Sequence, residues 1–253
     1  TFSNDTGEMK TYRDAEDFAE VYPFIPYQFD LLQKVFEEVR LHGASGKHLS
    51  EGERSLLSAF QESAQVYAES ELNKLVPFST FYNTIETFLD STISRVIKKA
   101  ERNSNLEDED VEVLKVTFMI RYIEEVPANI ENITTLMISD INEDKLDLKE
   151  RIEASLDRLV RETLIQKNGP EYEFLTNEEQ DVNREIKATT IDPNKVVKKI
   201  GEIAFENIYS DRKYSYSSEY NFAFNKLVDD QARGRQHEEI GVQILTPYSN
   251  YAD

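Results

Sequence analysis

The stretch KLDLKERIEASLDRLVRETLIQKNGPEYEFLT, residues 145–176, decides the fold of the middle of the chain. Its first twenty residues have the apolar spacing of an amphipathic helix. Two short strand-like runs follow, separated by Asn168-Gly169, and an Asn-Gly pair in that position is the strongest short signal for a β-hairpin. Because the hairpin would fold back beside the helix, we expect one core to be shared by Val160, Leu164, Tyr172 and Phe174.

Two further helices are predicted before this stretch, over residues 111–124 and 130–139. Three helices followed by a hairpin is the order of elements in a winged helix. The acidic run NSNLEDEDVE at 103–112 indicates a junction before this module, and a capping pattern at Thr176 starts another helix after it. The sequence therefore predicts a winged-helix domain over residues 106–190.

Residues 1–105 are predicted to form a helical subdomain. Pro26 suits the first turn of a helix, since proline lacks an N–H that this turn leaves without a partner. The glycine-rich HGASG ends that helix, and Ser50 with Glu53 forms a capping box for the next one. Apolar spacing predicts a third, long helix over residues 81–97.

Residues 191–253 are predicted to be a helix plus β-strands, the start of a third domain. The helix covers 192–209, a pair of strands lies within 211–230, and one more strand lies within 238–248. The chain begins at TFSND without a methionine and stops while a β pattern is still running, so we expect a piece of a longer protein. The expected fold class is mainly α, with an α+β segment at the end.

The segment HGASGKHLSEGERSLL, residues 42–57, contains a Gly-Lys pair but is not a phosphate-binding loop. A P-loop has four residues between its two glycines and a hydroxyl residue after the lysine. Here only two residues lie between Gly43 and Gly46, His48 follows Lys47, and a helix rather than a strand is predicted before the segment. We therefore expect this chain to have no ATPase activity of its own.

Composition excludes several classes of protein. The 253 residues include no cysteine, so disulfides and thiolate metal sites are absent. Among the three histidines, His42 and His48 flank the glycine-rich turn without a third ligand nearby, so we expect two solvated turn residues and no metal site. No apolar run is long enough to span a membrane and no secretory signal is present, which together predict a cytoplasmic protein.

The charge pattern disfavours binding to duplex DNA. The formal net charge is −20, and residues 106–190 alone carry 10 basic and 22 acidic side chains. The predicted third helix has five of each sign, whereas a helix that faces phosphates normally carries a clear positive excess. We expect its charges to form i,i+4 pairs on a solvated or protein-facing surface. Any contact with nucleic acid needs a local basic patch.

Three tyrosines in the C-terminal region leave two interpretations open. Tyr214, Tyr216 and Tyr220, next to Arg212 and Lys213, have the composition of a stacking platform for single-stranded nucleic acid. The same alternation is typical of a pleated, half-buried strand, and this second interpretation is favoured.

Arg54 is the one candidate for a nucleotide-linked role. It lies just inside the helix that Ser50 caps. A helical subdomain followed by a winged helix resembles the C-terminal arrangement of AAA+ ATPases of the replication-initiator kind. In those proteins an arginine at the start of a lid helix reaches the γ-phosphate, for which its planar fork is suited. The resemblance implies a nucleotide-sensing Arg54 in an AAA+ lid; an arginine paired with Glu51 or Glu53 is the alternative.

The stretch YPFIPYQFDLLQKVFEEVRLHGASGKHLSEGERSLLSAFQ, residues 22–61, is similar to a segment of the large P-loop ATPase of bacterial BREX phage-defence systems, the BrxC/PglY type. Residues 148–186 and 208–216 also resemble that family, in the same order. The resemblance implies a parent protein that binds ATP and Mg²⁺ in a core outside these 253 residues. It also implies that the partners are other BREX components or further copies of the protein.

From this resemblance we expect a non-catalytic lid and winged-helix region that couples nucleotide state to protein or DNA assembly. The alternative is a free-standing winged-helix regulator that binds duplex DNA.

Overall fold

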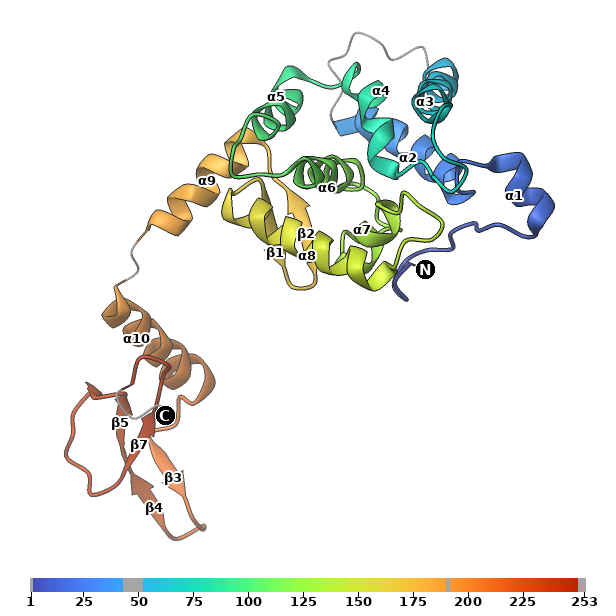
Figure 1. Cartoon of the computed structure of the whole chain (residues 1–253). Helices are drawn as coiled ribbons and strands as arrows, with labels where there is room; N and C mark the ends of the chain where they lie inside the picture. Colours follow the sequence, from blue (N-terminus) through green and yellow to red (C-terminus); the bar gives the residue numbers. More distant parts are fainter. Residues whose placement is uncertain (1, 43–51, 190–191, 250–253) are drawn as a thin grey trace. The chain divides into compact units, whose positions relative to one another are not determined.

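The computed structural model describes residues 2–42, 52–189 and 192–249, with the side chains of residues 52–54 excluded. The chain forms two compact units, Thr1–Glu185 and Ile186–Asp253 (Figure 1). Helices dominate the first unit, and small β-sheets occur in both, so the mainly α class is confirmed. None of the helices in the described ranges is long and apolar enough to cross a membrane.

The first part of unit 1 is helical, as predicted, but it is more broken than expected. Its elements are α1 (Ala15–Val21), α2 (Tyr27–His42), α3 (Gly52–Tyr67), the 3₁₀ helix η1 (Phe78–Phe81), α4 (Tyr82–Glu86) and α5 (Ser91–Ala100). The prediction of one helix over 81–97 was wrong. Asp90 has an extended backbone, and its carboxylate accepts the Thr92 N–H at 2.8 Å. This is an N-cap, so a new helix begins there.

The second part of unit 1 has the predicted order of elements. It contains α6 (Asp108–Met119), α7 (Ile130–Leu136), α8 (Lys145–Arg161), β1 (Ile165–Asn168), β2 (Glu171–Phe174) and α9 (Asn177–Ala188). The two strands pair antiparallel, with Ile165 opposite Phe174. Gly169 in the turn has φ +61°, a conformation that favours glycine. Thr176 and Glu179 cap α9 as predicted, since each side chain accepts the other residue's N–H.

One continuous core holds unit 1 together. In Figure 1, α6 lies in the middle of the unit, and it contacts η1, α4, α5, α7, α8 and β2. The Phe118 ring of α6 meets the Phe174 ring of β2 edge to face, with 5.2 Å between ring centroids. Leu164, Tyr172 and Phe174 are buried in this core and Val160 packs against it, which confirms the predicted cluster. Because the core takes side chains from both sides of residue 105, the division at 105/106 remains only a prediction.

Unit 2 is a helix with two small sheets. It contains α10 (Pro193–Glu202), a π-helical turn η2 (Ile203–Ile208), β3 (Lys213–Ser215), β4 (Asn221–Ala223), β5 (Asn225–Val228), β6 (Gln231–Arg233) and β7 (Gly241–Ile244). Strands β3 and β4 form a hairpin, and β5 pairs antiparallel with β6 and parallel with β7. Val197, Phe205 and Val228 form its small core. The helix is present, but 211–230 contains three strands, β3, β4 and β5, where a pair was predicted, and β6 was not predicted.

Candidate nucleic-acid interface

Helix α8 is the third helix of the predicted winged-helix module, the one that would face DNA in a DNA-binding protein of that kind. The Asp144 side chain caps its first turn by accepting the Leu146 N–H at 2.7 Å. Its apolar face is fully buried in the core of unit 1 through Leu148, Ile152, Leu156 and Leu159. The charged side chains therefore lie on the remaining faces, where their partners decide whether they are available to phosphates.

Carboxylates from other elements pair with three cations of α8, namely Lys149, Arg151 and Arg158. Lys149 contacts Glu131 of α7 at 2.6 Å. Arg151 contacts Glu143 at 2.9 Å and Glu109 at 3.2 Å. The prediction of i,i+4 pairs within the helix was wrong for Lys149 and Arg151, because their partners lie outside α8. A phosphate could reach these cations only by displacing a carboxylate.

The tightest of these pairs joins α8 to α6. Arg158 donates two hydrogen bonds to the fully buried Asp110 carboxylate, both at 2.7 Å, and Asp110 also accepts the Glu107 N–H at 2.9 Å. Burial alone would raise the pKa of Asp110, but the Arg158 guanidinium and the Glu107 amide outweigh it and hold that pKa below its usual range. The Arg158 guanidinium is thus held by the buried Asp110 carboxylate.

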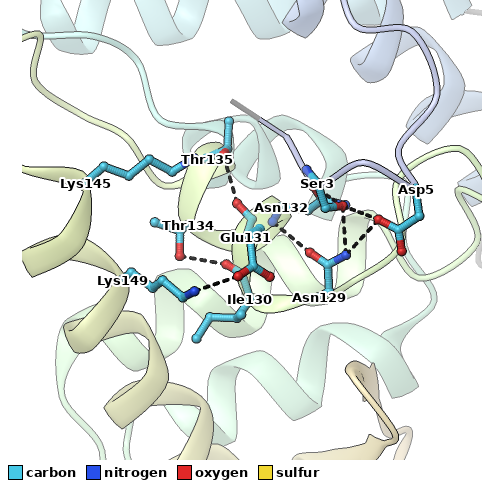
Figure 2. A network of polar contacts seen from close by, with 10 residues as sticks. All are labelled: Ser3, Asp5, Asn129, Ile130, Glu131, Asn132, Thr134, Thr135, Lys145 and Lys149. Atoms are coloured by element: carbon cyan, nitrogen blue, oxygen red, sulfur yellow. Dashed lines mark hydrogen bonds and ion pairs between the residues drawn. The ribbon is translucent and has the colours of Figure 1, made fainter.

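A second polar cluster ties the N-terminal segment to α7 (Figure 2). Asn132 is fully buried, and its side-chain oxygen accepts the Ser3 N–H at 2.8 Å and the Thr6 hydroxyl at 2.9 Å. The Asn129 side chain caps α7 by accepting the Asn132 N–H and donates to the Ser3 hydroxyl at 2.9 Å. Residues more than 120 positions apart are thereby held together by partly buried hydrogen bonds.

The other side of α7 is tied to α8 in the same view (Figure 2). Glu131 contacts Lys149, and the Lys149 ammonium holds the pKa of Glu131 below its ordinary value. Lys145 donates to the Thr135 hydroxyl at 2.9 Å. Helix α7 therefore stands between the N-terminal segment and α8, with polar contacts to each.

Helix α5 carries a basic stripe that the sequence analysis missed. We use this name for the four exposed side chains of Arg95, Lys98, Lys99 and Arg102. The spacing of 3 and 4 residues places Arg95, Lys98 and Lys99 on one face of α5, and Arg102 follows in the turn after the helix; this spacing was the available signal. Together with Asn103 and Asn177, the first residue of α9, they line a hollow of about 690 Å³.

The basic stripe is only partly neutralised. Lys98 contacts Glu86 at 2.8 Å, and Arg95 donates to the Ser91 carbonyl within its own helix. Lys99 and Arg102 make no ion pair or side-chain hydrogen bond to any of the residues that the structure describes. Lys99 and Arg102 are therefore two neighbouring cations without ion pairs at the end of α5, whereas on α8 the exposed Arg161 donates to the Asp157 carbonyl of its own helix.

The remaining candidates have separate outcomes. The Arg54 side chain, the Ser50–Glu53 cap and His48 lie outside the described residues, so the nucleotide-sensing role stays a prediction. His42 ends α2 and stacks on Tyr122 with 4.5 Å between ring centroids. Within the described ranges, no group of three histidine or carboxylate side chains is arranged to hold a metal ion.

The tyrosines of the C-terminal region are exposed. Tyr214 and Tyr216 lie on or next to β3, and Tyr220 precedes β4; all three are more than half exposed. The favoured interpretation of a half-buried strand was therefore wrong for these rings. Arg212 and Lys213 beside them are exposed as well.

The described residues define a helical unit that ends in a helix–hairpin module, followed by a small unit with one helix and five strands. Residues 189–253, which include most of that second unit, match the family model described as "BREX ATP-binding protein BrxC 4th domain with six-stranded beta sheet". The match shows that this segment, about a quarter of the chain, is similar to that BrxC domain. No solved structure matches the chain.

Proposed function

We propose that this chain is a non-catalytic region of a BrxC-type ATP-binding protein that couples nucleotide state to assembly with protein or DNA. In this proposal residues 1–105 act as an AAA+-like lid, residues 106–190 act as a winged helix, and residues 191–253 open a further domain. The single observation that carries the proposal is the match of residues 189–253 to a domain of an ATP-binding protein. ATP and Mg²⁺ bind elsewhere in that protein, because the Gly-Lys segment here lacks P-loop spacing.

The polar contacts of α7 supply a physical route for coupling. The N-terminal segment is held on α7 through Asn132, and α7 is held on α8 through the Glu131–Lys149 pair. Helix α8 continues directly into the β1–β2 hairpin. A displacement of the N-terminal segment can therefore move the hairpin through partly buried hydrogen bonds and an ion pair, instead of a flexible linker.

The rival role, a free-standing regulator that reads duplex DNA with α8, has less support. Lys149, Arg151 and Arg158 all contact carboxylates of the same unit. Sequence reading requires side chains that are free to reach base edges and phosphates.

The test is to break the α7 contacts in the ATP-binding protein that contains this chain. Asn132→Ala removes the buried acceptor of the Ser3 and Thr6 bonds, and Ser3→Ala removes only the hydroxyl that bonds to Asn129 and Asn132. Asn142→Ala, at an exposed position in the turn before α8, is the matched control.

Assembly is measured by sedimentation with ATP and with ADP, alongside ATP turnover. We expect the nucleotide to change the assembly constant of the wild type and the control by about 5–150-fold, the range of ordinary allosteric coupling. Both network variants should lose most of this difference while ATP turnover persists. Unchanged coupling in folded Asn132→Ala and Ser3→Ala proteins contradicts the route, and ATP hydrolysis by the 253-residue chain alone contradicts the non-catalytic assignment.

A further inference from the structure

We propose that the basic stripe on α5 binds the phosphodiester backbone of nucleic acid without reading its sequence. This inference rests on the proposed assembly role. It adds to that role by naming nucleic acid as the partner class and the basic stripe as the surface that binds it. The evidence is the free charge, its geometry and the hollow beside it.

The first observation is that the stripe is an exception in an acidic chain. The formal net charge is −20, and most of the described cations elsewhere in unit 1 contact a carboxylate, as Lys34, Lys74 and Arg121 do. Lys99 and Arg102 have no such partner among the described residues. Two exposed cations side by side repel each other, so this arrangement contributes nothing to the stability of α5 by itself.

The second observation is that the stripe has the geometry of a linear anion array. From Arg95 to Lys99 the helix rises by about 6 Å, at about 1.5 Å per residue, and Arg102 follows in the turn after the helix. Along one strand of duplex DNA the phosphates advance by about 3.4 Å each along the axis, so the helical part of the stripe spans about two of them. Four cations in a row match a repeating array better than a single carboxylate or a single bound phosphate.

The third observation is the chemistry of the hollow. Its lining consists of arginine, lysine and asparagine side chains, and no lining residue is a carboxylate. Arginine forks engage phosphate oxygens in pairs, and lysine adds a mobile point charge. The Asn177 amide already donates to the Thr92 carbonyl at 3.3 Å, which fixes the start of α9 beside α5. The hollow is therefore lined by α5 and by the first residue of α9, which this hydrogen bond holds together.

The acidity of the rest of the chain sets the strength of this binding. Duplex DNA is repelled by most of the surface, so the contact is weak and depends strongly on salt, with a dissociation constant of about 10⁻⁴ to 10⁻⁶ M at physiological salt. If the two unpaired cations each neutralise one phosphate, the logarithmic salt slope is about −1.8 for duplex and about −1.4 for single strands.

The experiment uses the 253-residue chain and labelled DNA of about 20 nucleotides, longer than the 4–16-nucleotide sites of typical single-strand binders. Anisotropy is recorded for duplex and single-stranded DNA between about 50 and 200 mM salt. The test variant is Lys99→Gln/Arg102→Gln. The control, Lys10→Gln/Lys34→Gln, makes the same change of net charge at two other exposed cations of unit 1.

We expect the test variant to lose binding at least tenfold at low salt and to lose most of the salt slope, while the control retains both. Equal binding by the test variant and the wild type, or no binding by the wild type at about 50 mM salt, overturns the inference. Polyglutamate of matched charge that binds as tightly as the oligonucleotide also overturns it, in favour of an acidic protein partner. ATP turnover is not part of the measurement, so this inference and the coupling role can fail independently.

Discussion

Removing the Asp110 carboxylate is the sharpest test of the claim that Arg158 of α8 is held in a buried ion pair. Asp110 is fully buried, and Arg158 is 22% exposed and forms two 2.7 Å hydrogen bonds to it. Asp110→Ala leaves that guanidinium without its buried partner. Asp110→Asn keeps the shape and one acceptor but removes the negative charge.

The expected cost follows from the burial of the two partners. Breaking a fully buried ion pair costs about 3–5 kcal/mol. Here the estimate is reduced to about 2–4 kcal/mol for Asp110→Ala, because Arg158 reaches water and retains Glu107 at 3.3 Å. Asp110→Asn should cost about 1–2 kcal/mol, since it exchanges charge-assisted hydrogen bonds for neutral ones. Arg151→Ala, which breaks more exposed pairs, should cost about 0–1 kcal/mol and serves as the control.

The pH dependence has a definite sign. The pKa of Asp110 is lowered in the folded chain, so its contribution to stability is present above the unfolded pKa of about 3.9. That contribution is lost as the pH falls through the lower, folded pKa. The difference in stability between the wild type and Asp110→Asn should therefore be constant from pH 7 to pH 5 and shrink below about pH 4.

The assay is urea unfolding followed by far-ultraviolet circular dichroism, because the chain has no tryptophan and unit 1 is mainly helical. The urea midpoint should fall without a change in the slope of the transition. A loss below about 0.5 kcal/mol for Asp110→Ala, the range of ordinary surface substitutions, would refute the buried pair and make Arg158 available to ligands.

Two further predictions concern the hairpin and the nucleotide. Phe174→Ala should cost about 3–5 kcal/mol in the same assay, because the fully buried ring packs on Phe118. Phe222→Ala in the exposed β3–β4 hairpin should cost less than about 1 kcal/mol, and an equally small loss for Phe174→Ala would mean that the β1–β2 hairpin is not part of the core. Arg54→Ala in the complete ATP-binding protein should lower ATP turnover without unfolding the protein. Arg54→Lys should restore turnover poorly, because lysine lacks the planar guanidinium fork. Unchanged turnover in the alanine variant would contradict the nucleotide-sensing hypothesis.

The parts of the fold that the sequence predicted are those with local causes. Asn168-Gly169 requires only its own backbone conformation to reverse the chain, and the Thr176–Glu179 cap closes within four residues. The broken helix was missed because its apolar period continues through 81–97, while one residue, Asp90, interrupts the backbone. A period describes which side chains are buried and does not guarantee a continuous helix.

The interior polar contacts could not be predicted in the same way. The Ser3–Asn132 bond joins residues 129 positions apart, and the Arg158–Asp110 pair joins residues 48 apart. Nothing in the composition of either segment selects its partner. These bonds form because the packing of apolar faces first brings α6, α7 and α8 together, and each buried polar group must then find a partner nearby.

The contrast between α5 and α8 explains why counting charges along a helix gives only part of the answer. The five cations and five anions counted along the predicted helix argued against a phosphate-facing surface, and the structure adds that carboxylates of other elements neutralise Lys149, Arg151 and Arg158. Three cations lie on α5 and Arg102 lies in the turn after it; of these four, Lys99 and Arg102 lack ion-pair partners within the described residues. Electrostatic attraction to a polyanion depends on cations that are not already neutralised, because each phosphate contact must release a counterion and not displace a carboxylate. We therefore propose the surface with unpaired charge as the binding surface, and not the one with the larger number of charged side chains.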